Sequence, residues 1–179
     1  SQFKNFGVNN GKVRKSIKSE VLFIERCLDL LKPGGELAII VPDGILSNVT
    51  YNYVRKGIKE RAIIKAIISL PSDAFISRGA TVKTSILYLK KKQSPEDVQG
   101  DVFMAIAEKI GYDTTGKEIP ENDLPGILMK YREYVEENDI NFTNTPSCFV
   151  TRWSDIGDRL DVKYYLPIYI NNNTFLEEK

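Results

Sequence analysis

Histidine is absent from this sequence of 179 residues, cysteine occurs twice and tryptophan once. The lack of histidine excludes every site that needs an imidazole, including Ser-His-Asp triads, histidine-bound zinc and histidine general bases. Of the two cysteines, Cys27 falls among apolar residues of a predicted helix, which is typical of a small core residue. We therefore expect neither a catalytic triad nor a metal site.

Long apolar runs are also missing from the sequence. None approaches the roughly 20 residues that a helix needs to cross a bilayer, and the N-terminus lacks the apolar core of a signal peptide. The remaining composition, 42% hydrophobic and 27% charged, is ordinary for a globular chain with one domain. These features predict a cytoplasmic protein without a membrane partner.

The net charge of +1 conceals a separation of charge along the chain. Residues 1–18 carry five Lys or Arg and no acid, residues 53–92 carry ten against two acids, and residues 93–140 carry four against twelve. One interpretation is that these are solvated faces that pair with each other. The other is a basic surface that faces a polyanion while the acidic region is turned away.

Hydrophobic periodicity predicts an α/β architecture. Apolar spacing and turn residues predict helices over 19–31, 51–61 and 124–137, strands over 36–41, 63–70, 84–89 and 102–107, a loop over 71–80 and a linker over 138–152. No helix-length segment separates the second strand from the third, so we expect that pair to be antiparallel. A doubly wound nucleotide-binding sheet would need earlier strands and a glycine-rich turn, and neither occurs here. The sheet is therefore expected to be partial.

Three stretches in unbroken order carry a family signature: "SEVLFIERCLDLLKPGGELAIIVPDGILSN", "VRKGIKERAIIKAIISLPSDAFISRGATVKTSILYLKKK" and "GYDTTGKEIPENDLPGIL". Together they resemble an N6-adenine DNA methyltransferase, and within that family the modification subunit of type I restriction-modification systems. The resemblance covers about residues 17–130. It implies half of a Rossmann-like sheet that uses S-adenosylmethionine, with 36–41 as its fifth strand, 63–70 as its sixth and 84–90 as the antiparallel seventh.

The same resemblance implies that the catalytic motif lies elsewhere. Family members bind S-adenosylmethionine through a glycine-rich loop and grip the adenine with an Asn-Pro-Pro-Tyr/Phe motif, but this sequence contains no Pro-Pro pair. The chain then resembles a C-terminal fragment of a parent enzyme that works on DNA with a specificity subunit and a restriction subunit. We expect the fragment to be inactive alone. Two alternatives stay open: a non-catalytic DNA-binding or assembly module, and a methyltransferase that acts on RNA or protein.

The resemblance assigns site residues at two places. Phe23, Pro42 and Asp43 match the edge of the cofactor cleft, although Phe23 can equally be a core residue and Asp43 can hold a turn. Phe75 matches the loop that holds the extruded target base, where stacking on a ring offsets part of the cost of extrusion. Its alternative role is to pack under its own loop.

Basic residues near this loop are candidates for phosphate contacts, which position DNA without reading its sequence. They are Arg55, Lys56, Lys59, Arg78 and Lys83. Each can also be a solubilising surface charge.

The C-terminal stretch "DRLDVKYYLPIY" resembles the opening of a type I specificity module. We accordingly divide the chain into a methyltransferase part over 1–110, a helical extension and linker over 111–150, and a third unit over 151–179. This unit is either the start of a target-recognition module or an aromatic arm that docks on a partner.

Overall fold

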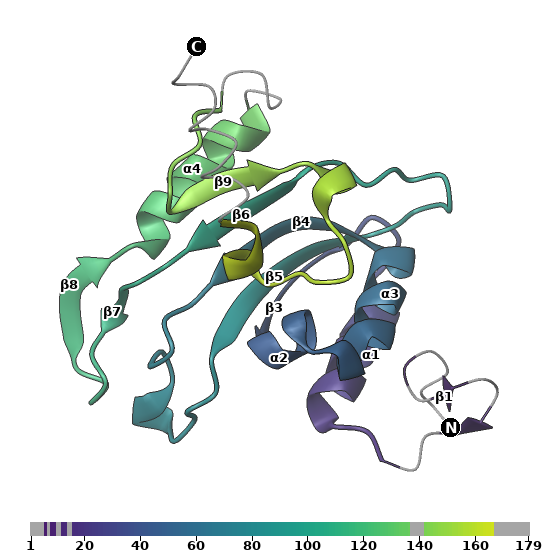
Figure 1. The fold of residues 1–179 in the computed structure, drawn as a ribbon, viewed down its shortest axis with the longest axis horizontal. Coiled ribbons are helices and arrows are strands. Elements are labelled where there is room, and N and C mark those ends of the chain that lie inside the picture. The colour runs from purple at the N-terminus through teal and green to yellow at the C-terminus, as the bar shows by residue number, and fades with distance from the viewer. Residues whose placement is uncertain (1–5, 7, 10–11, 14–15, 137–141, 167–179) are drawn as a thin grey trace.

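The computed structural model describes residues 6, 8–9, 12–13, 16–136 and 142–166. The chain combines strands and helices in an α/β protein, and the five strands between residues 62 and 122 follow one another without an α-helix (Figure 1). The elements are β1 (Val8–Asn9), β2 (Lys12–Val13), α1 (Ser19–Leu30), β3 (Glu36–Pro42), α2 (Asp43–Ser47), α3 (Asn52–Arg61), β4 (Ala62–Ser69), β5 (Thr84–Lys91), β6 (Val102–Ile106), β7 (Ile110–Tyr112), β8 (Glu118–Asn122), α4 (Leu124–Glu136) and β9 (Cys148–Thr151). Short 3₁₀ turns occupy Val49–Tyr51, Ile76–Arg78 and Trp153–Asp155.

The main sheet has five strands in the order β3-β5-β4-β6-β9. Strand β5 lies between β3 and β4 and is antiparallel to both, with Ile86 opposite Ile40 on one side and Ile68 on the other. The prediction that residues 36–41, 63–70 and 84–90 are neighbours is confirmed, and so is the reversed direction of β5. Because β3 and β4 both oppose β5, their carboxyl ends lie at the same edge of the sheet.

The predicted linker over 138–152 is wrong at its C-terminal end. Residues Cys148–Thr151 form β9, which pairs antiparallel with β6 and closes that side of the sheet. The strand has only four residues, so it is too short to show an alternating pattern in the sequence. The division between a second and a third unit at residue 150 therefore falls inside a strand.

Apolar side chains cover both faces of the sheet. Helices α1, α2 and α3 form the larger core together with residues 153–166, which we call the strap, while α4 packs on the opposite face (Figure 1). Within the strap, Ile156, Leu160, Val162 and Tyr165 are buried in the same cluster as the first three helices. The described part of the predicted third unit is thus packed into the core of the predicted first unit rather than separate from it.

Phe6 packs between α1 and α3. Phe6 is 1% exposed, and its N–H donates a 2.8 Å hydrogen bond to Oε2 of the buried Glu25 on α1. Its ring lies against Gly57 on α3, where a Cβ would come within 2.4 Å of Cε1. Glycine at position 57 therefore makes room for the ring.

Helix α1 ends before Pro33 and Gly34. Cys27 on this helix is half-buried and packs at the border of the core.

Strands β7 and β8 form a separate hairpin beside the main sheet. Asp113 orders its tip, because its Oδ1 accepts hydrogen bonds from the N–H groups of Thr115 and Lys117. Gly116 has φ +87° and lies so close to Ser77 that an added Cβ would be 3.2 Å from the Ser77 Cβ. The hairpin tip thus rests on the loop that follows β4.

The helices of the described ranges are all too short or too polar to span a lipid bilayer. The same ranges hold no group of three acidic or cysteine side chains arranged to bind a metal ion.

Candidate functional site

Polar side chains gather where β3 and β4 end and β5 begins. Pro42 lies opposite Thr84, and Ser69 lies opposite Ser85, so the three strands bring Asp43, Ser69, Lys83 and Ser85 to one edge of the sheet. We call these four residues the carboxyl-edge cluster. Open α/β sheets place their ligands at this edge.

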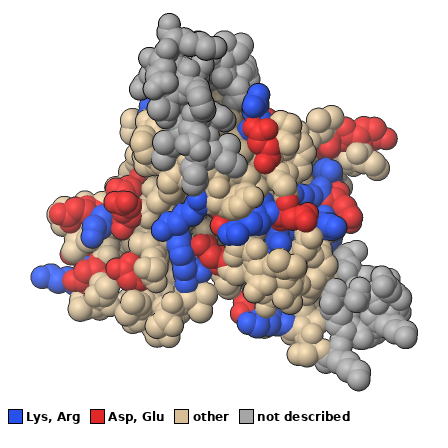
Figure 2. All heavy atoms as spheres, viewed as in Figure 1, with Lys and Arg blue, Asp and Glu red and all other residues tan. Residues whose placement is uncertain are grey.

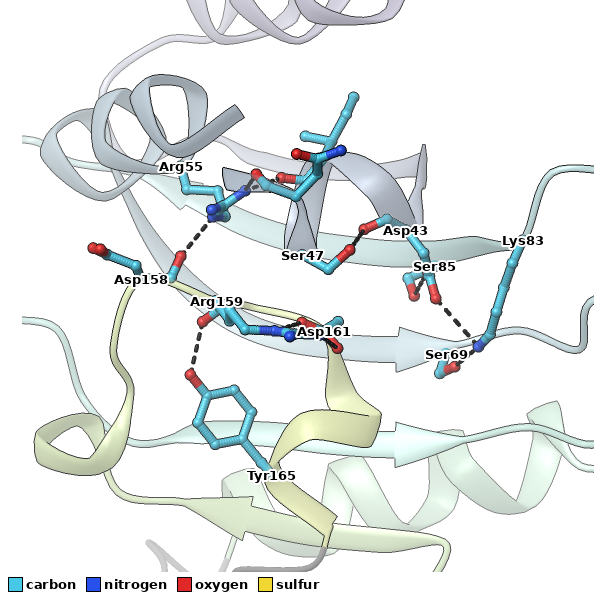
Figure 3. A network of polar contacts seen from close by, with 12 residues as sticks. Asp43, Ser47, Arg55, Ser69, Lys83, Ser85, Asp158, Arg159, Asp161 and Tyr165 are labelled. Carbon is cyan, nitrogen blue, oxygen red and sulfur yellow. Dashed lines mark hydrogen bonds and ion pairs between the residues drawn. The ribbon is translucent and has the colours of Figure 1, made fainter. Parts of the chain in front are cut away.

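The cluster is held by short polar contacts, drawn in Figure 3. Ser85 Oγ donates to Asp43 Oδ1 at 2.6 Å, Lys83 Nζ lies 3.2 Å from Asp43 Oδ2, and Lys83 Nζ donates to Ser69 Oγ at 2.6 Å. Ser69 and Ser85 are 2% and 1% exposed. Because both carboxylate oxygens of Asp43 already accept a donor, the cluster joins three strand ends rather than presenting a free base.

Asp43 has a more specific place than the predicted turn. It is the first residue of α2, its N–H donates to the Lys83 carbonyl at 2.9 Å, and its carbonyl accepts from Ser47 Oγ at 2.9 Å. Lys83, predicted to contact phosphate, is committed to Asp43 and Ser69, so a phosphate would have to compete with that carboxylate. Neither partner could be foreseen from the sequence, since Asp43 and Lys83 meet only through the strand pairing.

Arg55 requires a correction. The prediction made it a phosphate contact, but the residue is 2% exposed, with its guanidinium pointing inward from α3. Nη1 donates to the carbonyls of Ile45 at 2.7 Å and Asn48 at 2.8 Å, and Nε donates to the carbonyl of Asp158 at 2.5 Å. Burial lowers the pKa of Arg55, and the nearby carboxylates of Asp158 and Asp161 oppose that shift. Arg55 is a structural residue because it is buried and backbone carbonyls accept the N–H groups of its Nη1 and Nε.

The other predicted phosphate contacts differ in exposure. Lys59 donates to the Gly157 carbonyl at 2.6 Å, and its Nζ lies 5.0 Å from the centroid of the Trp153 ring. Burial lowers the pKa of Lys59, with Asp158 opposing and Arg55 adding to the shift. Lys56 and Arg78 are exposed. Of the five predicted residues, these two have the accessibility that a phosphate contact needs.

Phe75 lies in the loop after β4, as predicted, and is half-buried. Its ring packs against the cluster on the α4 face of the sheet, and its carbonyl accepts hydrogen bonds from Arg78 at 3.0 Å and Ala80 at 3.1 Å. The ring is therefore partly packed on this face of the sheet. Stacking on a target base stays a prediction.

Phe23 is 62% exposed on α1 and belongs to neither hydrophobic cluster of the described residues. The alternative that it is a core residue is wrong, whereas its role at the edge of a cofactor cleft stays a prediction. The structure joins Pro42 and Asp43 to Lys83 through the strand ends, but it places Phe23 on a different element.

Opposite charges are interspersed on the face in Figure 2, including both signs on the β7–β8 hairpin. The ion pairs of the described residues are Arg61–Asp29, Lys83–Asp43, Lys130–Glu133, Arg152–Asp155 and Arg159–Asp161. None of these pairs joins the basic block over 53–92 to the acidic block over 93–140. The interpretation in which the two blocks neutralise each other therefore finds no support among the described side chains.

A pocket of about 850 Å³ lies between α4 and the loop that leads into β9. Ile127 and Lys130 of α4, Cys148 of β9 and Leu166 of the strap are among its lining residues. Burial raises the pKa of the Cys148 thiol, which keeps it protonated and unreactive. No residue of the carboxyl-edge cluster lines this pocket, so it is distinct from the candidate site.

Comparison with known proteins identifies the family. The family described as N-6 DNA Methylase matches residues 2–172 of the chain. The chain belongs to this family. The type I restriction enzyme EcoKI methylase subunit of Escherichia coli K12 is 28% identical over 80 residues, which is 44% of this chain and 15% of that protein. A putative type II restriction enzyme and methyltransferase of Methanocaldococcus jannaschii is 27% identical over 180 residues, covering 88% of this chain and 15% of that protein.

Solved structures agree with the fold of this chain. A chain from a type I restriction-modification system superposes with a TM-score of 0.67 at 16% identity, covering 91% of this chain and 37% of that one. The type I methyltransferase subunit of Streptococcus thermophilus gives a TM-score of 0.63 at 22% identity, covering 86% of this chain and 31% of that one. The chain thus spans about 15% of the length of the curated relatives described above.

Ser69 and Ser85 are the site residues that the sequence analysis missed. Ser69 ends the apolar run "AIIS" of β4, and Ser85 lies at the start of the run "TSIL" of β5. A serine at such a boundary is a weak signal, because only the pairing of β4 with β5 shows that the two hydroxyls meet.

Proposed function

We propose that this chain is part of an adenine-N6 DNA methyltransferase of a type I-like restriction-modification system. The parent enzyme transfers the methyl group of S-adenosylmethionine to adenine in duplex DNA. The observation that carries the proposal is the family match over residues 2–172, which spans the reversed strand β5 between β3 and β4.

The free edge of β3 supports the idea of a partial sheet. Among the described strands, β3 pairs only with β5, and Ile40 on this strand is 50% exposed. A long edge strand with exposed apolar side chains is usually covered or paired in a finished protein. The missing glycine-rich loop and Asn-Pro-Pro-Tyr/Phe motif fit the same view, since both precede β3 in the family pattern.

The residues present fit one edge of a cofactor site and not the whole of it. S-adenosylmethionine supplies a methyl group on a sulfonium centre. Asp43 already has both carboxylate oxygens engaged, Pro42 offers an apolar surface, and the exposed ring of Phe23 can stack on an adenine. Methyl transfer needs donor and acceptor in line, so the described chain orients and supports the cleft while the transferring groups come from other residues.

For DNA, the proposal assigns Phe75 to the extruded base and Lys56 and Arg78 to phosphates. The exposure of both cations supports this assignment. A specificity subunit that selects the DNA site and a restriction subunit are the proposed partners. The cytoplasm is the proposed compartment, because the substrate lies there.

The test is to incubate the full-length protein with duplex DNA and S-adenosylmethionine, then digest the DNA and measure N6-methyladenine by mass spectrometry. We expect methyladenine from the full-length protein in the presence of its specificity subunit and none from residues 1–179 alone. Methylated RNA or protein with unmodified DNA would support a different acceptor. Methyladenine from the isolated chain would overturn the proposal that the transferring groups come from residues outside it.

A further inference from the structure

One guanidinium joins two segments that are far apart in the sequence. Arg55 on α3 donates to the carbonyls of Ile45 and Asn48, which lie in and directly after α2, and to the carbonyl of Asp158 in the strap. Figure 3 shows these contacts on one side of α2 and the carboxyl-edge cluster on the other. Arg55 therefore touches both the helix that begins at Asp43 and the segment more than 100 positions later in the chain.

Helix α2 is held at both ends. At its start, Asp43 bonds Ser85 and Lys83 in the carboxyl-edge cluster. In its middle and directly after its end, Arg55 binds the carbonyls of Ile45 and Asn48. In between, the Leu46 carbonyl accepts a 2.9 Å hydrogen bond from the N–H of Leu160 in the strap. A five-residue helix has little stability of its own, so its position depends on these contacts.

The strap is a built element of the core. Lys59 binds the Gly157 carbonyl and the Trp153 ring, and Asn52 Nδ2 donates to Asp158 Oδ2 at 3.1 Å. The N–H of Trp153 donates to Asp101 Oδ1 at 2.8 Å. The strap therefore bonds α3 through several side chains and α2 through its backbone.

We propose that Arg55 is a positioning residue that couples the strap to α2, so that movement of the strap changes the position of Asp43 at the cofactor side of the cleft. A planar guanidinium presents donors in several fixed directions, which suits three carbonyls from two segments, whereas an ammonium does not. A partner that binds the strap, or a segment that follows it in the chain, then acts on the cofactor cleft by moving α2. The part concerning the cofactor rests on the proposed function.

The first test measures amide hydrogen exchange in the full-length protein. Arg55→Lys keeps the charge but loses the planar guanidinium and its fixed donor directions. We expect the amides of Asn48 and Leu160 to exchange about tenfold faster, since the lost hydrogen bonds are charge-assisted. Glu60→Gln, an exposed change on the same helix, is the matched control and should leave both rates unchanged. The amides of β5 report on global opening and should also be unchanged.

Unchanged exchange at Asn48 and Leu160 would overturn the coupling. Equal acceleration in β5 would do so as well, because it would mean general destabilisation. Arg55→Ala with added guanidinium ion gives an independent readout: slow exchange at α2 should return with guanidinium and not with the same concentration of sodium chloride.

The second test measures S-adenosylmethionine affinity by calorimetry with the same variants. We expect Arg55→Lys to raise the dissociation constant about tenfold, by the same loss of charge-assisted bonds, and Glu60→Gln to leave it unchanged. If exchange in α2 accelerates while affinity stays the same, the transmission to the cleft is wrong. If the wild-type protein binds no S-adenosylmethionine, the proposed function fails, and the exchange experiment alone judges the coupling.

Discussion

The Tyr165 hydroxyl donates a 2.7 Å hydrogen bond to the Arg159 carbonyl within the strap, from a residue that is 1% exposed. Burial raises the pKa of Tyr165 to about 12. Tyrosine in an unfolded chain titrates near pH 10, so the unfolded state loses its proton first as the pH rises. This contribution to stability is complete below about pH 10 and is lost as the pH rises towards 12.

Tyr165→Phe should lower the free energy of unfolding by about 1 kcal/mol at neutral pH, because the Arg159 carbonyl loses its donor. It should also make the loss of stability between about pH 10 and 12 less steep. Urea unfolding at several pH values measures both effects. The control is Tyr164→Phe on the 49% exposed neighbouring ring, and an equal effect of the two substitutions would contradict the prediction.

Single residues were the least predictable from the sequence. Arg55 and Lys56 are adjacent and carry the same charge, yet one is buried and the other is exposed. Arg55 lies on α3 beside Val54, at the border of the apolar stripe, and its burial is completed by Asp158 and the rest of the strap. A contact with a segment so distant in sequence leaves no local pattern to read.

At the scale of elements, Phe6 and Gly57 form a matched pair between the N-terminal segment and α3. Gly57→Ala would stabilise an isolated helix by about 1 kcal/mol, but here the new Cβ would meet the Phe6 ring at 2.4 Å. We therefore expect Gly57→Ala to destabilise the protein and Phe6→Ala to cost about 3 kcal/mol. In the Phe6→Ala background, Gly57→Ala should become neutral or stabilising.

Urea unfolding of the two single variants and the double variant measures the interaction energy between positions 6 and 57. Additive effects would mean that the ring does not occupy the space above Gly57.

The β7–β8 hairpin and α4 offer a pair of glycine substitutions whose expected effects on stability have opposite signs. Gly116→Ala should destabilise by about 1 kcal/mol, because φ is +87° and the new Cβ would press on Ser77. Gly126→Ala, which has open space inside α4, should stabilise by up to about 1 kcal/mol. Thermal unfolding of both variants tests the prediction, and a shift of the same sign in both would refute it.

Long elements were predictable, and among the short ones β6 was predicted from its apolar run whereas α2 and β9 were not. The apolar runs of β3, β4 and β5 and the apolar stripe of α1 were predicted because each covers enough residues to show its period. Helix α2 has five residues and β9 has four, so neither shows a repeat. At the candidate site, the place of Pro42 and Asp43 at a strand end was predicted, whereas the serines and the partners of Lys83 depend on register.

At the scale of the whole molecule, the C-terminal segment completes the fold. Phe149 of β9 and Leu160 and Tyr165 of the strap are each 1% exposed or less. Burial of one large apolar side chain contributes about 1.5–3 kcal/mol, and a domain has a net stability of only about 5–15 kcal/mol. Truncation after Ser147 should therefore abolish cooperative unfolding.

Near-ultraviolet circular dichroism and a thermal melt compare the truncated chain with the intact one. A cooperative transition within a few degrees of the intact chain would show that the predicted boundary near residue 150 was correct after all. The sequence pointed to that boundary because "DRLDVKYYLPIY" resembles a module start. Whether a segment packs on a core or leaves it depends on surfaces that the rest of the chain forms.

The place of β5 in the sheet has a consequence for synthesis. Pro42, at the end of β3, has Thr84 as its partner in register, and β4 cannot substitute because β5 lies between them. A ribosome adds about 5–20 residues per second, so β3 emerges a few seconds before the strand that pairs with it. Within the described chain, Ile39 and Val41 lack their strand neighbour during that interval, so this apolar strand of the nascent polypeptide is exposed to aggregation or to a chaperone.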